Sequence, residues 1–152
     1  AITRCANMYG GGDLNWNRIV PGTMRSVINA ESPIIRSDGS PKRDYIYVKD
    51  VVSACIMLIE NLAVDPNLHM GQAYNFGADD PVSAIEMVNN ILKVSGSHNL
   101  EAVIQNTAVN EIQDQYLSSS LAEKQLGWKA KYSLVEGLSE TLSWYKTFLS
   151  QK

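Results

Sequence analysis

The sequence contains little cysteine and little histidine, and both scarcities limit the chemistry that it can carry. Its 152 residues include two cysteines and two histidines. Cys5 and Cys55 lie far apart in the sequence and in apolar surroundings, which favours buried free thiols in a reducing cytoplasm over a disulfide. His69 and His98 are isolated, with no partner at the spacing of metal ligands, so no metal site is expected.

Long apolar runs and an excess of positive charge are also missing. The longest apolar run, residues 51–59, is too short to span a bilayer and is interrupted by Ser53. The formal net charge is −3 at pH 7, which argues against a broad basic face for nucleic acid. The sequence therefore predicts no membrane and no nucleic-acid partner, and any phosphate must be bound by one or two placed cations.

The short motifs of nucleotide binding and hydrolysis are absent too. The run "GGGD" at residues 10–13 suggests a phosphate loop, but the sequence has no Gly-x-Gly-x-x-Gly, no Gly-Lys-Ser/Thr and no Gly-x-Ser-x-Gly. Because no helix begins directly after the glycines, a flexible loop is the better interpretation. Asn7, just ahead of them, comes at the end of a predicted strand, where α/β sheets place ligand contacts.

What the sequence does contain is an alternation of short strands and helices, which predicts the α/β class. Strands are predicted over residues 1–6, 44–48, 73–77 and 100–105. Helices are predicted over residues 18–30, 51–62, 83–96 and 119–128, with a last one from residue 133.

Several of these helices carry recognisable start signals. Ser83 with Glu86, and Ser133 with Glu136, have the spacing of capping boxes. Asp50 is expected to cap the helix over residues 51–62. That helix is apolar nearly all round, so burial on more than one side is expected.

Arg43 is the first candidate for a phosphate contact, because it follows a glycine turn and directly precedes a strand. A guanidinium at such a place can hold a phosphate through two parallel hydrogen bonds. The alternative is a solvated surface arginine that pairs with Asp44 or Asp50. Spacing alone favours that alternative, since surface arginines are common.

Taken in order, several segments of the chain resemble one family. "TRCANMYGGGD", "NRIVP", "RDYIYVKDV", "YNFG", "LGW" and "SLVEGLSETLSWYK" are similar to the C-terminal half of extended short-chain dehydrogenase/reductases that act on nucleotide sugars. Two stretches, "GGGD…NRIVP" and "EIQDQYLSSSLAEKQLGWKAKYSL", look most like CDP-glucose 4,6-dehydratase. The resemblance implies that residues 1–152 are the substrate-binding part of an extended Rossmann-type fold, an incomplete parallel sheet with a small α/β lobe.

The resemblance also implies roles for individual residues, and it reverses the interpretation of Arg43. In the family, the arginine at this place contacts the substrate diphosphate, the asparagine matched by Asn7 contacts the nucleotide sugar, and the residue matched by Met8 lies against NAD. Many members carry a second arginine before the final short helix, which this chain lacks. The other residues that match substrate-side positions, or remain as polar candidates there, are Arg18, Ile19, Ile34, Ile35, Arg36, Asn75, Glu111 and Tyr116.

The implied function is that of an NAD-dependent nucleotide-sugar 4,6-dehydratase, which forms a 4-keto-6-deoxy sugar. A nucleotide-sugar 4-epimerase and a non-catalytic nucleotide-sugar-binding module are the alternatives. In the family, the glycine motif, the Tyr-x-x-x-Lys pair and the acid–base residues lie in the N-terminal half. This chain is therefore expected to bind substrate without catalysing alone, as part of a cytoplasmic, homodimeric protein.

Overall fold

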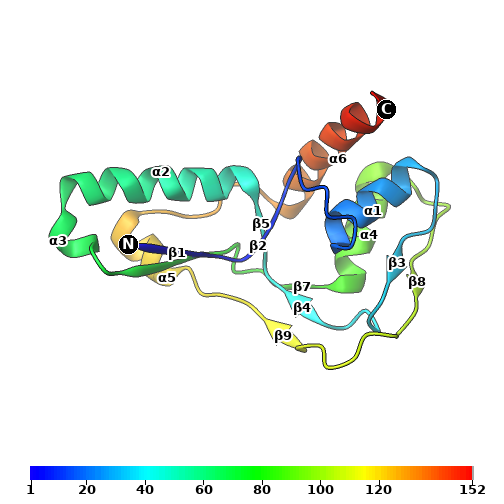
Figure 1. The fold of residues 1–152 in the computed structure, drawn as a ribbon, viewed down its shortest axis with the longest axis horizontal. Helices are drawn as coiled ribbons and strands as arrows, with labels where there is room; N and C mark the ends of the chain where they lie inside the picture. Colours follow the sequence, from blue (N-terminus) through cyan, green and yellow to red (C-terminus); the bar gives the residue numbers. More distant parts are fainter. Residues whose placement is uncertain (152) are drawn as a thin grey trace.

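The computed structural model describes residues 1–151, which form short strands and six helices (Figure 1). The strands are β1 (Ile2–Cys5), β2 (Asn7–Tyr9), β3 (Ile34–Ile35), β4 (Lys42–Arg43), β5 (Tyr45–Tyr47), β6 (Ala73–Phe76), β7 (Val82–Ser83), β8 (Val103–Ile104) and β9 (Asp114–Gln115). The helices are α1 (Ile19–Ile28), α2 (Val48–Val64), α3 (Pro66–His69), α4 (Ala84–Ser95), α5 (Ser120–Leu126) and α6 (Leu134–Ser150).

Most strand pairs are parallel and join segments that are distant in the sequence. β1 pairs with β6, β2 with β5, and β3 with β8, each in parallel. β4 lies between β7, which runs antiparallel to it, and β9, which runs parallel. Parallel pairs connected through helices define the α/β class, so the predicted fold class is confirmed.

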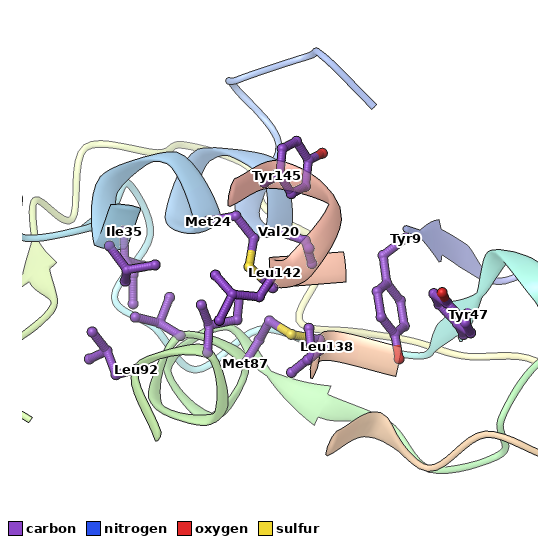
Figure 2. Close-up of a cluster of buried hydrophobic side chains, with 13 residues drawn as sticks. Tyr9, Val20, Met24, Ile35, Tyr47, Met87, Leu92, Leu138, Leu142 and Tyr145 are labelled. Carbon is purple, nitrogen blue, oxygen red and sulfur yellow. The ribbon is translucent and has the colours of Figure 1, made fainter. Parts of the chain in front are cut away.

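The elements form two regions at opposite ends of the molecule (Figure 1). We call α1, α4 and α6 the helical lobe, and β1, β6, α2 and α5 the strand layer. Each region has its own cluster of buried side chains. Figure 2 shows how side chains of the three lobe helices point toward one another, with Tyr9 and Tyr47 at the margin of the cluster. The strand β5 joins the regions, because Ile46 belongs to one cluster and Tyr47 to the other.

Both predicted capping boxes are present. The Ser83 hydroxyl accepts a hydrogen bond from the Glu86 backbone N–H, and the Glu86 carboxylate accepts one from Ser83 in return. Ser133 and Glu136 do the same at the start of α6. These paired bonds satisfy backbone N–H groups that have no partner within the helix, which explains why α4 and α6 begin where they do.

The prediction that Asp50 caps a helix from residue 51 is wrong. The helix α2 begins at Val48, so Asp50 lies within its first turn and is buried. Its carboxylate instead accepts hydrogen bonds from the backbone N–H groups of Lys131 at 3.0 Å and Tyr132 at 3.2 Å. Asp50 thus ties α2 to the segment that leads into α6.

The burial on more than one side that was expected for this helix is not found among the described residues. One face of α2 is buried through Val51, Ala54 and Leu58. On another face, Val52 and Ile56 are each 52% exposed. Part of the apolar surface of α2 is therefore not covered by the described residues.

The glycine run, interpreted from the sequence as a flexible loop, contacts α6 at Gly11. The Gly11 backbone lies against the indole ring of Trp144, so that a β-carbon at this position would overlap the ring. The Tyr145 hydroxyl donates a hydrogen bond to the Asp13 carbonyl. Two adjacent aromatic residues of α6 therefore hold the loop that leads into α1.

Candidate functional site

A cavity of about 560 Å³ lies between α1 and the segment of residues 34–45. Its size falls in the range of pockets that bind small molecules. Polar and charged side chains are prominent in its lining. Seven of the residues singled out from the sequence line it, namely Arg18, Ile19, Ile34, Ile35, Arg36, Arg43 and Glu111.

Two of the lining arginines are held by the loop ahead of α1. Arg18 Nη1 lies 3.1 Å from Asp13 Oδ2 in an ion pair. Arg36 Nη2 donates to Asn17 Oδ1 at 2.8 Å. Asp13 also accepts from the backbone N–H of Asn15 at 3.0 Å, so the loop is ordered by its own polar side chains.

Arg43 does not form the ion pairs that the surface interpretation required. Its Nη1 donates to the carbonyls of Lys42 at 2.8 Å and Gln113 at 3.4 Å. Among the described residues, neither Asp44 nor Asp50 pairs with it. Its backbone is in β4, the central strand of its small sheet, so its position is fixed while its charge is not neutralised by an acid.

The cavity is strongly cationic for a protein with a net negative charge. Of its charged lining residues, Arg18, Arg25, Arg36 and Arg43 are positive and only Glu111 is negative. Because Asp13 neutralises Arg18, three arginines face one carboxylate. An anionic ligand would complement this excess of positive charge.

The strand that carries Arg43 is anchored by its neighbour Asp44, which is 2% exposed. Asp44 Oδ1 accepts from the backbone N–H of Ala78 at 3.1 Å, whereas Oδ2 has no hydrogen-bond partner among residues 1–151. Burial raises the pKa of this carboxyl group above its usual range. Ser119 continues the link, because its Oγ accepts from the Gly77 backbone N–H at 2.8 Å.

Four of the predicted site residues do not reach the cavity. Asn7 and Met8 lie on β2, where Asn7 is in register with Tyr45, a lining residue one strand away. The Asn75 amide donates to the Ser118 carbonyl at 3.3 Å. Tyr116 is 64% exposed and lies outside the lining.

The structure adds lining residues that the sequence analysis missed, above all Arg25 and Trp16. The Arg25 guanidinium carbon lies 5.0 Å from the centroid of the Trp16 ring. A signal for Arg25 was present, since it follows Arg18 by seven residues, or two helical turns, and residues at that spacing share a helix face. No pattern in the sequence indicates Trp16.

The described residues contain neither a cluster of metal ligands nor a helix that could span a membrane. Residues 1–151 contain no group of three or more His, Cys, Asp and Glu side chains arranged to hold a metal ion. Over the same residues, every helix is too short or too polar to cross a bilayer.

Comparison with known proteins shows which family the sequence resembles. Residues 1–77 match the model of the "NAD dependent epimerase/dehydratase family". A UDP-glucose 4-epimerase of Pisum sativum is 35% identical over 109 residues, which cover 72% of the chain and 31% of the relative. CDP-glucose 4,6-dehydratase of Salmonella typhimurium is 27% identical over 151 residues, covering 98% of the chain and 42% of the relative.

A solved structure gives the same result for the fold. The chain superimposes on UDP-glucose 4-epimerase of Thermotoga maritima, crystallised with UDP-glucose, with a TM-score of 0.82 and 25% identity. The match covers 97% of this chain and 46% of that one. The fold is therefore that of the Rossmann-type epimerases and dehydratases, as the resemblance implied, and the chain spans less than half the length of these relatives.

Proposed function

Because the chain belongs to the NAD dependent epimerase/dehydratase family, we propose that it forms the nucleotide-sugar-binding part of an enzyme of this family. The cavity between α1 and residues 34–45 is the proposed binding site of the nucleotide sugar. The dinucleotide-binding part is proposed to lie outside residues 1–152, as the absence of its glycine motif from this sequence suggests.

The excess of arginine over carboxylate in the cavity is the observation that carries the proposal. A nucleotide sugar brings a diphosphate with one negative charge on each phosphate. Planar guanidinium groups form parallel hydrogen bonds to pairs of phosphate oxygens, which an ammonium group does not reproduce. Arg43, placed on the central strand β4 and free of acidic partners among the described residues, is the proposed main diphosphate ligand.

The remaining residues are proposed to act around that contact. Arg18, Ile19, Ile34, Ile35 and Arg36 would surround the base and ribose, and all of them line the same cavity. Asn7, Asn75, Glu111 and Tyr116 are proposed to face the nucleotide sugar from β2, β6 and the segment before α5.

NAD is the proposed cofactor, and its chemistry is to accept a hydride from the sugar and return it. Within this chain only Met8 is assigned to it. Met8 is 53% exposed on β2, one strand away from the cavity-lining β5, which leaves an apolar surface available to a planar ring. The chain's own part is to bind the sugar nucleotide and hold it beside that surface.

We propose that the complete protein converts a nucleotide hexose to its 4-keto-6-deoxy sugar, as CDP-glucose 4,6-dehydratase does, with oxidation at C4, loss of water across C5 and C6, and return of the hydride to C6. The similarity to that dehydratase over 98% of the chain and the position of Glu111 in the cavity support it. A 4-epimerase is the second candidate, supported by the higher identity of 35% to the pea enzyme. We propose further that the complete protein is a homodimer in the cytoplasm. The two free thiols of Cys5 and Cys55 are the state that a reducing compartment favours.

The experiment uses the complete gene product that contains this chain. Isothermal titration with CDP-, UDP- and dTDP-glucose identifies the nucleotide, and the product formed with NAD separates a 4-keto-6-deoxy sugar from a C4 epimer. Arg43→Ala should weaken binding by roughly a hundredfold, since charged hydrogen bonds of about 1.5–3 kcal/mol are lost. Lys93→Ala, an exposed cation on α4 outside the cavity, is the control. Failure of all three nucleotide sugars to bind, or no effect of Arg43→Ala, would overturn the proposal.

A further inference from the structure

Arg25 presents a second placed cation to the cavity. It belongs to the last turn of α1, and its guanidinium lies over the face of Trp16, with both side chains in the cavity lining. No acidic side chain forms an ion pair with it within residues 1–151. Arg25 therefore brings a positive charge to the cavity that nothing in the described structure neutralises.

The Trp16 ring restrains the position of that guanidinium, whose carbon lies 5.0 Å from the ring centroid. A guanidinium over an aromatic face keeps its N–H donors, which lie in its own plane, available to a ligand. Trp16 is itself supported, because its ring packs against Tyr145 of α6 with centroids 5.9 Å apart. An arginine whose side chain is already ordered loses less conformational entropy when it binds an anion.

Arg25 and Arg43 approach the cavity from different elements, α1 and β4. With Arg18 neutralised by Asp13, the lining retains three arginines against the single carboxylate of Glu111. The resulting excess of two positive charges matches in magnitude the two negative charges of a diphosphate between nucleoside and sugar. Without Arg25, the lining would fall one charge short of that match.

We infer that Arg25, held on Trp16, binds the diphosphate of the nucleotide sugar together with Arg43. The inference rests on the proposed function and assigns it a residue that neither the sequence motifs nor the resemblance pointed to. Trp16 acts in it as a positioning residue, which orders the guanidinium without contacting the phosphates.

The test measures dissociation constants in the complete gene product, with the nucleotide sugar that binds most tightly and with inorganic pyrophosphate as competitor. Arg25→Ala should weaken both ligands by on the order of tenfold. Arg25→Lys should recover only part of the loss, because an ammonium group does not form two parallel hydrogen bonds to a phosphate. Lys93→Ala again serves as the control for an exposed cation outside the cavity.

A second set of variants tests the role of the stack. Trp16→Leu should weaken binding less than Arg25→Ala, and the double variant should lose little more than Arg25→Ala alone, because the tryptophan acts through the arginine. The salt dependence of binding should also become shallower in Arg25→Ala, as expected for the loss of a charge contact.

Three results would overturn the inference in distinguishable ways. Unchanged affinities in Arg25→Ala with lower thermal stability would show that Arg25 only packs on Trp16 or stabilises the C-terminus of α1. A loss of nucleotide-sugar binding with unchanged pyrophosphate competition would assign Arg25 to another part of the ligand. If the unmodified protein binds no nucleotide sugar at all, the proposed function fails, and the inference fails with it.

Discussion

The helical lobe and the strand layer solve the problem of burying apolar surface differently. In the lobe, α1, α4 and α6 turn their apolar faces toward one another, and Met24, Met87 and Leu138 are fully buried where they meet (Figure 2). In the strand layer, α2 buries one face against its neighbours and leaves Val52, Ile56 and Ile59 more than half exposed. The lobe is closed by this chain, whereas the strand layer is not.

The position of the cavity follows from this difference. Its walls include α1, which the closed core of the lobe fixes in place, and β4, which the link from Asp44 to Ala78 anchors. Ligand-binding residues are most effective on elements whose positions are determined by packing. The cavity therefore lies beside the closed region, while the open face of α2 is free for other contacts.

The largest expected effect separates the two regions by a matched pair of substitutions. Ile91→Ala, at a fully buried position of α4, should lower the free energy of unfolding by about 2–5 kcal/mol, because it leaves a cavity among the lobe helices. Ile56→Ala, at a position 52% exposed on α2, should cost less than about 1 kcal/mol. Urea denaturation of the complete gene product measures both values.

Equal losses from the two substitutions would break the comparison. They would mean that another part of the complete protein covers the face of α2 that is exposed in this chain. Val135→Ala, 49% exposed on α6, is the control for surface substitutions within the lobe, and its effect should resemble that of Ile56→Ala.

The sequence predicts the lobe better than the loops around the cavity, for physical reasons. Capping boxes and apolar periodicity are local patterns, and they located α4 and α6 correctly through Ser83 and Ser133. Asp50 has the same local pattern as a cap, yet its partners lie about 80 residues away at Lys131 and Tyr132. Local sequence carries no information about such distant partners.

The same limit explains which site residues could be found. Motif order points to Arg43 and Arg36 as candidates, and both line the same cavity. The two-residue strands β4, β7 and β9 are too short to leave a periodic signal. Trp16 and Arg25 line the cavity because a loop held by α6 brings them together, and that packing joins residues 132 positions apart, as in the bond from Tyr145 to Asp13.

An intermediate effect is expected where the glycine run meets α6. Gly11→Ala should cost about 1–3 kcal/mol, because the added methyl group overlaps the Trp144 ring and forces it to move. The cost should fall substantially in a Trp144→Leu background, which a double-mutant cycle on unfolding free energies measures.

Gly12→Ala is the control for that cycle. A β-carbon at Gly12 would meet no atom within 4 Å, but the residue adopts a φ of +96°, so its substitution strains the backbone whatever the neighbours are. Gly12→Ala should lower the free energy of unfolding by the same amount in the unmodified protein and in the Trp144→Leu background. If Gly11→Ala behaves in the same way as Gly12→Ala, the contact with α6 does not hold the loop.

The smallest expected effects are changes of stability with pH. The contributions of Glu86 and Asp44 to stability should change in opposite directions, because their pKa values are shifted in opposite directions. Hydrogen bonds from the Ser83 backbone and hydroxyl lower the pKa of Glu86, so its stabilisation is present above the usual glutamate pKa of about 4.3 and is lost as pH falls through the lowered value. The Tm difference between the unmodified protein and Glu86→Gln should therefore shrink as pH falls toward 3.

Asp44 should show the reverse. Burial raises its pKa, so its ionisation disfavours the folded state, and that cost is absent below the usual aspartate pKa of about 3.9 and grows as pH rises toward the raised value. The Tm of Asp44→Asn relative to the unmodified protein should thus increase from pH 3 to pH 7. A relative Tm that instead decreases over this range would mean that the Asp44 carboxylate has a partner in the complete protein. In that case the strand carrying Arg43 is anchored by a charged contact and not by a buried, disfavoured carboxyl group.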